Sequence, residues 1–100
     1  MIHLTEKTDI QVAIQPVDFR RQINGLIALC QHHFHRNPRS GTYFVFMNRA
    51  KTMIRVLHFD GSGYWVATKR LSQGRFSGWP SLNEPMTTMS AVELIKILKK

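Results

Sequence analysis

The amino-acid sequence predicts a single small α+β domain of order β-α-β-β-β-α, in which an antiparallel β-meander packs against a long helix. Between residues 41 and 80, three runs rich in aromatic and β-branched residues are separated by two short polar breaks, a pattern typical of a meander. A strand-like alternation and a helical apolar stripe precede this region. A shorter helical stripe follows it near the C-terminus.

Residues 9–15 and the segment after them show two different periodicities. Ile10, Val12 and Ile14 alternate with more polar residues, so a half-buried strand is expected there, ended by Pro16. Asp18 is placed to cap the following helix or to lie in its first turn. Cys30 falls on the apolar stripe of this helix and is expected in the core, not as a reactive thiol. The stripe runs over about 16 residues: Phe19, Ile23, Leu26, Ile27, Cys30 and Phe34.

The meander is the firmest expectation. Its first strand is apolar on both faces, as a central strand covered on both sides would be. The break Asp60-Gly61-Ser62-Gly63 predicts a hairpin, because glycine adopts positive φ without steric cost. The other break, residues 48–52, carries Arg49 and Lys51. The three strands are expected at residues 42–47, 53–59 and 64–71.

Residues 72–80 predict an ordered loop, because fixing the aromatic side chains of Phe76 and Trp79 requires burial to offset the lost entropy. Residues 81–89 are interpreted as a proline-containing connector. The segment Ser90-Ala91-Val92-Glu93 has the spacing of a capping box. The helix that it begins is short, so it must dock on the rest of the domain or on a partner.

Length and composition bound the architecture further. One hundred residues, 43% apolar and 20% charged, suit one globular domain over residues 1–100 with a modest core. The ordered body is expected over residues 9–98, with residues 1–8 loosely held. No apolar run approaches the roughly 20 residues that span a bilayer, and no signal peptide is recognised. The lone cysteine suits a reducing compartment. The expected location is the cytoplasm, in association with the nucleoid.

The net charge is +8, from 14 Lys and Arg against 6 Asp and Glu. Residues 41–80 hold six of the cations and one of the anions, so the excess lies on the meander. A domain this basic usually meets a polyanion such as nucleic acid; a solvated basic surface without a partner is the alternative. Tyr64 and Trp65 are candidates for base stacking or for core packing. The expected phosphate contacts are Arg49, Lys51, Lys69, Arg70 and Arg75.

Catalysis, metal binding and a small-molecule substrate are not expected. The six carboxylates form no set that would converge on a metal pair, and no nucleophile elbow, P-loop or His-Glu-x-x-His motif is present. In the cluster His32-His33-Phe34-His35, only His32 and His35 share a helical face, and no nearby acid or cysteine completes a tetrahedral site. Surface histidines near a helix C-terminus are the favoured interpretation. No cofactor is expected.

Several short motifs follow one another in a set order and spacing over residues 9–98. They are Asp18-Phe19-Arg20-Arg21, Gly25-Leu26, Gly41-x-x-Phe44-Val45-Phe46, Asn48-Arg49, Asp60-Gly61-Ser62-Gly63-Tyr64-Trp65, Lys69-Arg70-Leu71, Gly74-Arg75-Phe76 and Trp79-Pro80. This ordered set resembles the second-open-reading-frame accessory proteins, often called TnpB, of the insertion-sequence-sixty-six family of bacterial mobile elements. Val17 departs from the family pattern, which usually has threonine at that position, and the loop before Trp79 is one residue longer.

The resemblance implies a non-catalytic protein that supports DNA transposition and is encoded beside a separate transposase, which carries the catalytic acids. It transfers no catalytic residue to this chain. Together with the charge distribution, it favours an accessory factor that binds DNA, at element ends or non-specifically, through the basic face of the meander. The alternative is an adaptor that docks on the transposase without touching DNA, using Phe76, Trp79 and the C-terminal helix. A small nuclease has little support.

Overall fold

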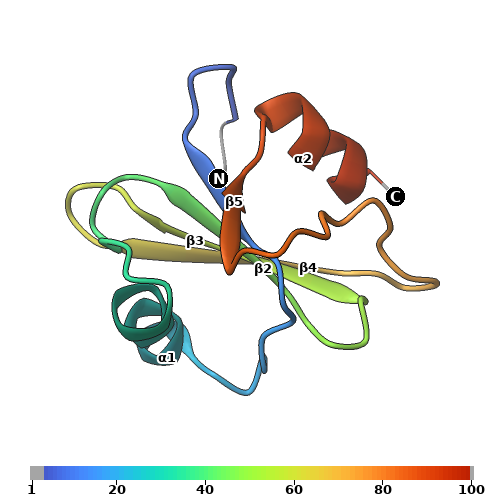
Figure 1. The fold of residues 1–100 in the computed structure, drawn as a ribbon, viewed down its shortest axis with the longest axis horizontal. Coiled ribbons are helices and arrows are strands. Elements are labelled where there is room, and N and C mark those ends of the chain that lie inside the picture. Colours follow the sequence, from blue (N-terminus) through green and yellow to red (C-terminus); the bar gives the residue numbers. More distant parts are fainter. Residues whose placement is uncertain (1–3, 100) are drawn as a thin grey trace.

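The computed structural model describes residues 4–99, which form a five-stranded sheet with helix α1 on one face and helix α2 on the other (Figure 1). Helix α1 continues directly into a π-helical segment, η1. None of the helices in residues 4–99 is long and apolar enough to cross a membrane. The elements are β1 (Ile10–Ala13), α1 (Ile23–Ala28), η1 (Leu29–His33), β2 (Tyr43–Met47), β3 (Met53–Phe59), β4 (Tyr64–Arg70), β5 (Met86–Thr88) and α2 (Ala91–Leu98).

The sheet has the strand order β4-β3-β2-β1-β5. Its first three strands form the antiparallel meander that the sequence predicts, with Val45 opposite Val56 and Val56 opposite Ala67. Strand β1 runs parallel to β2 and antiparallel to β5, so the sheet is mixed. The expected α+β fold class is confirmed.

Strand β1 is more deeply buried than its alternation predicts, because a strand lies on each side of it and a helix over each face. Ile10 and Val12 belong to the core between the sheet and α2, whereas Ala13 belongs to the core between the sheet and α1. All three side chains are fully buried. The expectation of a half-buried strand is therefore wrong.

The long helix is shorter than predicted, because it begins at Ile23 and not near Asp18. The N-cap residue is Gln22, which makes no side-chain capping bond. Upstream, the Val17 N–H donates to the Met47 carbonyl at 2.9 Å, which holds the chain alongside the end of β2. Position 17 is therefore not a capping position in this fold. At the other end, the Phe34 N–H bonds to the Leu29 carbonyl five residues back.

Strand β5 lies inside the segment that the sequence analysis interprets as a connector. It pairs with β1 through Thr88 opposite Gln11, and the Gln11 side-chain amide also donates to the Thr88 hydroxyl at 2.9 Å. The expectation of an ordered 72–80 loop is confirmed: Phe76 is buried and the Trp79 indole N–H donates to the Ala13 carbonyl at 3.0 Å.

Both ends of the domain add to the core on the α2 side. The capping box is present, since the Ser90 hydroxyl accepts from the Glu93 N–H and the Glu93 carboxylate accepts from the Ser90 N–H. Leu94 and Ile97 of α2 pack into the core with Val56. Leu4 packs against the same core, so part of the 1–8 segment is held by the body. The rest of that expectation, residues 1–3, lies outside the described residues.

Candidate nucleic-acid interface

The β2–β3 turn is built by the side chain of Asn48. Its Oδ1 atom accepts from the backbone N–H groups of Thr52 at 2.9 Å and Met53 at 3.0 Å, and its Nδ2 atom donates to the Thr52 hydroxyl. Lys51 adopts a left-handed conformation, with φ of 62°, to close the turn. The side chains of Arg49 and Lys51 are thereby exposed at the tip of the turn.

Two backbone hydrogen bonds attach the end of β4 and the following loop to this turn. The Leu71 N–H donates to the Thr52 carbonyl at 2.9 Å, and the Phe76 N–H donates to the Lys51 carbonyl at 2.7 Å. Arg70 and Arg75, each one residue from these bonds, are exposed beside the turn. We call the four residues Arg49, Lys51, Arg70 and Arg75 the cationic end of the sheet.

The fifth predicted phosphate contact, Lys69, lies elsewhere. Lys69 pairs with Ile54, whose side chain packs under α2, so Lys69 projects on the α2 face, opposite to Arg70. Its ammonium group donates to the carbonyl oxygen of Leu98 at the C-terminal end of α2. Four of the five expected residues therefore gather at one end of the sheet, and Lys69 serves the contact between β4 and α2.

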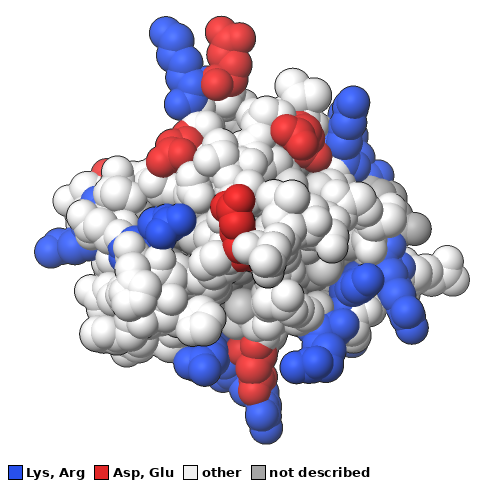
Figure 2. All heavy atoms as spheres, in the orientation of Figure 1, with Lys and Arg blue, Asp and Glu red and all other residues white. Residues whose placement is uncertain are grey.

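The cationic end contains no acid. In Figure 2 lysine and arginine side chains gather over the β2–β3 turn and the loop after β4, and one acidic side chain lies beside the cations at the bottom of the view. Among residues 4–99, the single ion pair joins Arg20 to Asp18 at 2.6 Å. The positive charge of the cationic end is therefore not neutralised within the described part of the protein.

A cleft of about 610 Å³ lies between the 16–20 segment and the β2–β3 turn, next to the cationic end. Arg20, Arg49 and Arg55 line it, together with Asp18. The Asp18 carboxylate accepts hydrogen bonds from the Arg20 guanidinium and backbone N–H, and these bonds lower its pKa from 3.8 to about 2. Arg20 offsets Asp18, so the cleft keeps a net positive charge.

Arg55 is the residue of this region that the sequence analysis did not select. Its Nη1 atom donates to the carbonyls of Phe19 and Arg21, both at 2.9 Å, and its guanidinium lies 4.7 Å from the centre of the Phe19 ring. Its Nε atom donates to the Thr68 hydroxyl. The sequence feature that could have identified Arg55 is its position as the one charged residue among the apolar residues of one strand face. Arg55 anchors the chain before α1 to the sheet.

Comparison with known proteins decides the family. The family described as IS66 Orf2 like protein matches residues 8–99. The chain belongs to this family. It is therefore an accessory protein of an insertion sequence, and the resemblance seen in the sequence is confirmed.

Two relatives of this IS66 Orf2-like protein come from Sinorhizobium fredii (strain NBRC 101917 / NGR234). The uncharacterized protein y4jC is 40% identical over 84 residues, which cover 84% of this chain and 71% of the relative. The uncharacterized protein y4hO is 31% identical over 98 residues, covering 98% and 84% of the two chains. No solved structure matches the IS66 Orf2-like chain.

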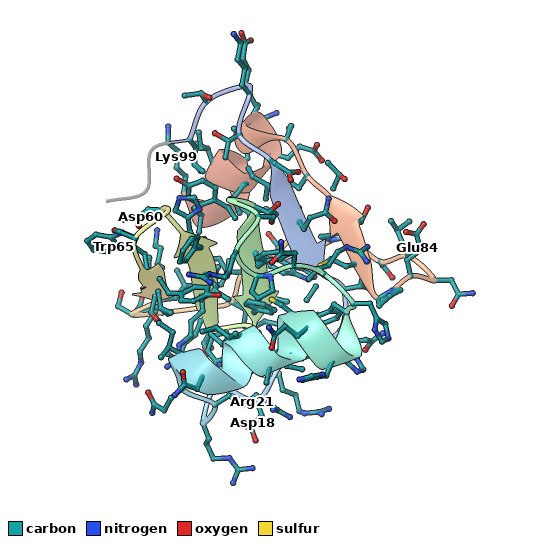
Figure 3. The ribbon with its side chains drawn as sticks, turned by 90° about the vertical axis from the view of Figure 1, so that its left-hand side faces the viewer. Asp18, Arg21, Asp60, Trp65, Glu84 and Lys99 are labelled. Atoms are coloured by element: carbon teal, nitrogen blue, oxygen red, sulfur yellow. The ribbon has the colours of Figure 1, made fainter. Side chains whose placement is uncertain are left out.

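The aromatic candidates of this IS66 Orf2-like protein lie away from the cationic end. Trp65 is 58% exposed at the opposite end of β4, and its indole N–H donates to the Asp60 carboxylate at 2.7 Å (Figure 3). Tyr64 is half-buried against Phe59. At about 3.3 Å per residue, Trp65 lies roughly 17 Å along the strand from Arg70. The aromatic and cationic candidates therefore do not form one continuous platform.

The two aromatics expected at a partner surface, Phe76 and Trp79, are held inward. Phe76 is 3% exposed and belongs to the core under α2, so its ring is not at the surface. Trp79 is partly buried against the same core, with its indole N–H bonded to Ala13. Burial offsets the entropy cost of ordering this loop, which is why these rings point inward.

The histidines and the cysteine of the IS66 Orf2-like chain are also placed by the fold. Because η1 is π-helical and His35 has a φ of 55°, His32 and His35 do not share the regular α-helical face assumed from their spacing. Within residues 4–99, no three His, Cys, Asp or Glu side chains are grouped to hold a metal ion. Cys30 is fully buried, and burial raises the pKa of its thiol to about 12, which confirms it as a core residue.

Proposed function

We propose that this accessory protein binds DNA directly, with the phosphate backbone contacted by the cationic end, and that it supports transposition in this way without performing catalysis itself. The observation that carries the proposal is the gathering of Arg49, Lys51, Arg70 and Arg75 on three chain segments, with no acidic side chain in an ion pair with any of them among residues 4–99.

Physical chemistry supports this use of the site. Exposed Lys and Arg side chains neutralise DNA phosphates and release condensed counterions, which gives affinity without requiring base recognition. The turn that presents Arg49 and Lys51 is fixed by the Asn48 side chain, so these cations start from an ordered backbone. The adjacent cleft, which Arg49 also lines, offers a further anion-binding position beside the cationic end.

The direct experiment is a titration of the protein against duplex DNA, at several salt concentrations, with an element end and a scrambled sequence compared. If four to five phosphates are neutralised, the log–log salt dependence should have a slope of about −4. Tighter binding to the element end would add site recognition to the proposal. Absence of binding to either DNA at low salt would overturn it.

A charge-matched pair of variants tests the assignment of residues. Arg49, Lys51 and Arg75 are reversed to Glu in one variant, and Lys7, Arg39 and Lys99 in the control. Each set of three reversals changes the net charge by −6, from +8 to +2. We expect DNA binding to be lost in the first variant and largely kept in the control. Equal losses would show that net charge, and not the cationic end, governs binding.

The proposal assigns DNA cleavage and strand transfer to the separately encoded transposase. In this chain Asp18 is paired with Arg20, Asp60 closes the β3–β4 hairpin and Glu93 caps α2, so three of the carboxylates have structural partners. An assay for metal-dependent nicking of supercoiled DNA tests this part. Cleavage that is retained by a recombinant, transposase-free preparation and lost on substitution of one carboxylate would contradict it.

An adaptor that docks on the transposase is the second candidate. The observation that favours it is Val92, an apolar side chain on α2 that is 62% exposed and could contact a partner. Phe76 and Trp79, buried as described, do not provide such a surface. Co-purification with the transposase that survives nuclease treatment and high salt, and that is lost on Val92→Asp, would favour the adaptor, because both treatments weaken DNA bridging.

A further inference from the structure

We propose that two copies of this chain pair through the free edges of their β4 strands, antiparallel and centred on Ala67, so that the two sheets become one. Strand β4 is the outermost strand of the sheet, seven residues long, and Figure 3 shows it at the edge with the Asp60–Trp65 end facing the viewer. Long exposed edges are templates for pairing with another chain. The inference stands independently of DNA binding.

The hydrogen-bond pattern of the β3–β4 hairpin identifies which backbone groups are free. Bonds from Asp60 N–H to the Gly63 carbonyl and from Leu71 N–H to the Thr52 carbonyl close the two ends of the ladder. In an antiparallel ladder the bonded pairs alternate, so Trp65, Ala67 and Lys69 direct their backbone groups toward β3. The groups directed outward belong to Tyr64, Val66, Thr68 and Arg70.

One register uses all of these outward groups. When Ala67 lies on the two-fold axis, Tyr64 pairs with Arg70 of the second copy and Val66 pairs with Thr68. All four outward residues are then in hydrogen-bonded pairs, each of which exchanges two N–H···O bonds. Ala67 lies opposite Ala67 of the second copy in a non-hydrogen-bonded pair. Side chains approach most closely in such pairs, and two methyl groups are small enough to fit there.

The side chains of β4 are self-complementary in this register. The strand is aromatic at its start and cationic at its end, so an antiparallel copy places Lys69 opposite Trp65 and Arg70 opposite Tyr64. A cation placed over the face of an aromatic ring is attracted to the ring. Trp65 is suited to this, because it is 58% exposed and its indole N–H is already held by Asp60.

Charge also disfavours a shift of the axis toward the C-terminal end of β4. Moving the axis by two residues, from Ala67 to Lys69, would place two lysines directly opposite each other, which is destabilising in a cross-strand pair. Cationic residues on an edge strand normally oppose indiscriminate pairing. Here they disfavour that shift, whereas the register centred on Ala67 keeps the like charges apart, because both cations lie at the same end of the strand. The other sheet edge, β5, has three residues and offers a much shorter ladder.

Sedimentation or light scattering over a concentration series from micromolar to millimolar measures the pairing, and two substitutions of Trp65 test its register. Trp65→Glu places an acid opposite Lys69 of the second copy and should retain the dimer. Trp65→Lys places a cation there and should weaken dimerisation by about tenfold relative to Trp65→Glu. A wild-type protein that stays monomeric throughout would overturn the proposal.

The same two variants separate pairing from stability of the single chain. Within one chain, residue 65 lies beside Asp60, so lysine at this position should be the more favourable in the monomer and glutamate the less favourable. The expected orders for thermal stability and for dimerisation are therefore opposite. If both properties follow the same order, Trp65 acts through Asp60 alone and the register is wrong.

Cysteine cross-linking gives a readout that does not depend on Trp65. In the proposed register two Ala67→Cys residues would have Cα atoms about 4.5 Å apart, within the range for a disulfide. Two Thr68→Cys residues would lie diagonally, at roughly 7–8 Å, beyond it. With oxidised glutathione, we expect a covalent dimer from the first variant and little from the second. Cys30 is buried and offers no competing thiol. Equal cross-linking of both variants would reject this register.

Discussion

The backbone N–H of Phe76 donates a hydrogen bond to the carbonyl oxygen of Lys51 at 2.7 Å, which joins the loop after β4 to the β2–β3 turn. The ring of Phe76 is 3% exposed in the core under α2. One residue therefore links the hydrophobic core to the exposed surface that carries Lys51 and Arg75. An uncharged core residue is thus responsible for part of the geometry of the cationic end.

Replacing Phe76 by alanine should lower both stability and DNA affinity. Removing a buried phenylalanine ring leaves a cavity and costs about 3–5 kcal/mol in free energy of unfolding. Without this anchor the loop no longer holds Arg75 beside Lys51, so DNA binding should weaken although no charge is removed. Urea denaturation and a DNA titration at low temperature measure the two effects. Ser77→Ala, on the exposed neighbour, should change stability by less than about 0.5 kcal/mol.

Arg55 and Arg49 should separate structural from binding roles. Arg55→Met removes the donor that serves the Phe19 and Arg21 carbonyls, and we expect a loss of about 1–2 kcal/mol in free energy of unfolding. Arg49→Met, at an exposed position of the turn, should leave stability within about 0.5 kcal/mol and weaken DNA binding. Chemical denaturation beside DNA titration makes the comparison. A large stability loss for Arg49→Met would show that the turn depends on its side chain.

The loss of stability at acid pH should depend in part on Asp18. Hydrogen bonds from the Arg20 guanidinium and backbone N–H lower its pKa from 3.8 to about 2 in the folded protein. The charged form therefore contributes stability above the unfolded pKa, and this contribution is lost as pH falls from 3.8 toward about 2. Asp18→Asn should flatten the dependence of unfolding free energy on pH in this window. An acid limb as steep as that of the wild type would contradict the expectation. Glu84→Gln serves as the control that removes the same charge at an exposed position.

Local sequence features were sufficient to predict the meander, because its information is local. Two turns marked by Asn48 and by Asp60 separate three β-rich runs, and the same residues make the hydrogen bonds that build those turns. The capping box of α2 is equally local, since Ser90 and Glu93 satisfy each other. In each case the residues that predict the turn or the cap also make the hydrogen bonds that stabilise it.

The features that were missed depend on contacts distant in sequence. Strand β5 forms because Thr87 and Thr88 pair with β1, which lies more than seventy positions away in the chain. The Gln11–Thr88 side-chain hydrogen bond is one of these contacts. Helix α1 begins later than predicted because Val17 bonds to Met47, a contact that no local sequence pattern predicts. Propensity near Asp18 favoured a helix, and tertiary pairing overrode it.

The candidate site was predicted in part, and the residue that was misplaced is instructive. The excess of cations on the meander identified Arg49, Lys51, Arg70 and Arg75. Lys69 and Arg70 are neighbours in a strand, so their side chains must point to opposite faces, and strand alternation alone excluded a common surface for them. The position of Arg75 beside the turn required the burial of Phe76, which charge counting does not reveal.

Cys30 provides a chemical measure of how tightly the α1 side of the core is closed. The thiol is inaccessible to solvent in the folded state. Burial also raises its pKa to about 12, so the reactive thiolate is scarce at pH 8. Alkylation by iodoacetamide should therefore proceed only when the core opens and should accelerate steeply as urea approaches the unfolding midpoint. Thr68→Cys, which adds an exposed thiol on β4, should gain one rapidly reacting equivalent while Cys30 stays protected. Rapid alkylation of the wild-type protein in the absence of denaturant would mean that α1 and η1 open from the sheet far more readily than the rest of the domain unfolds.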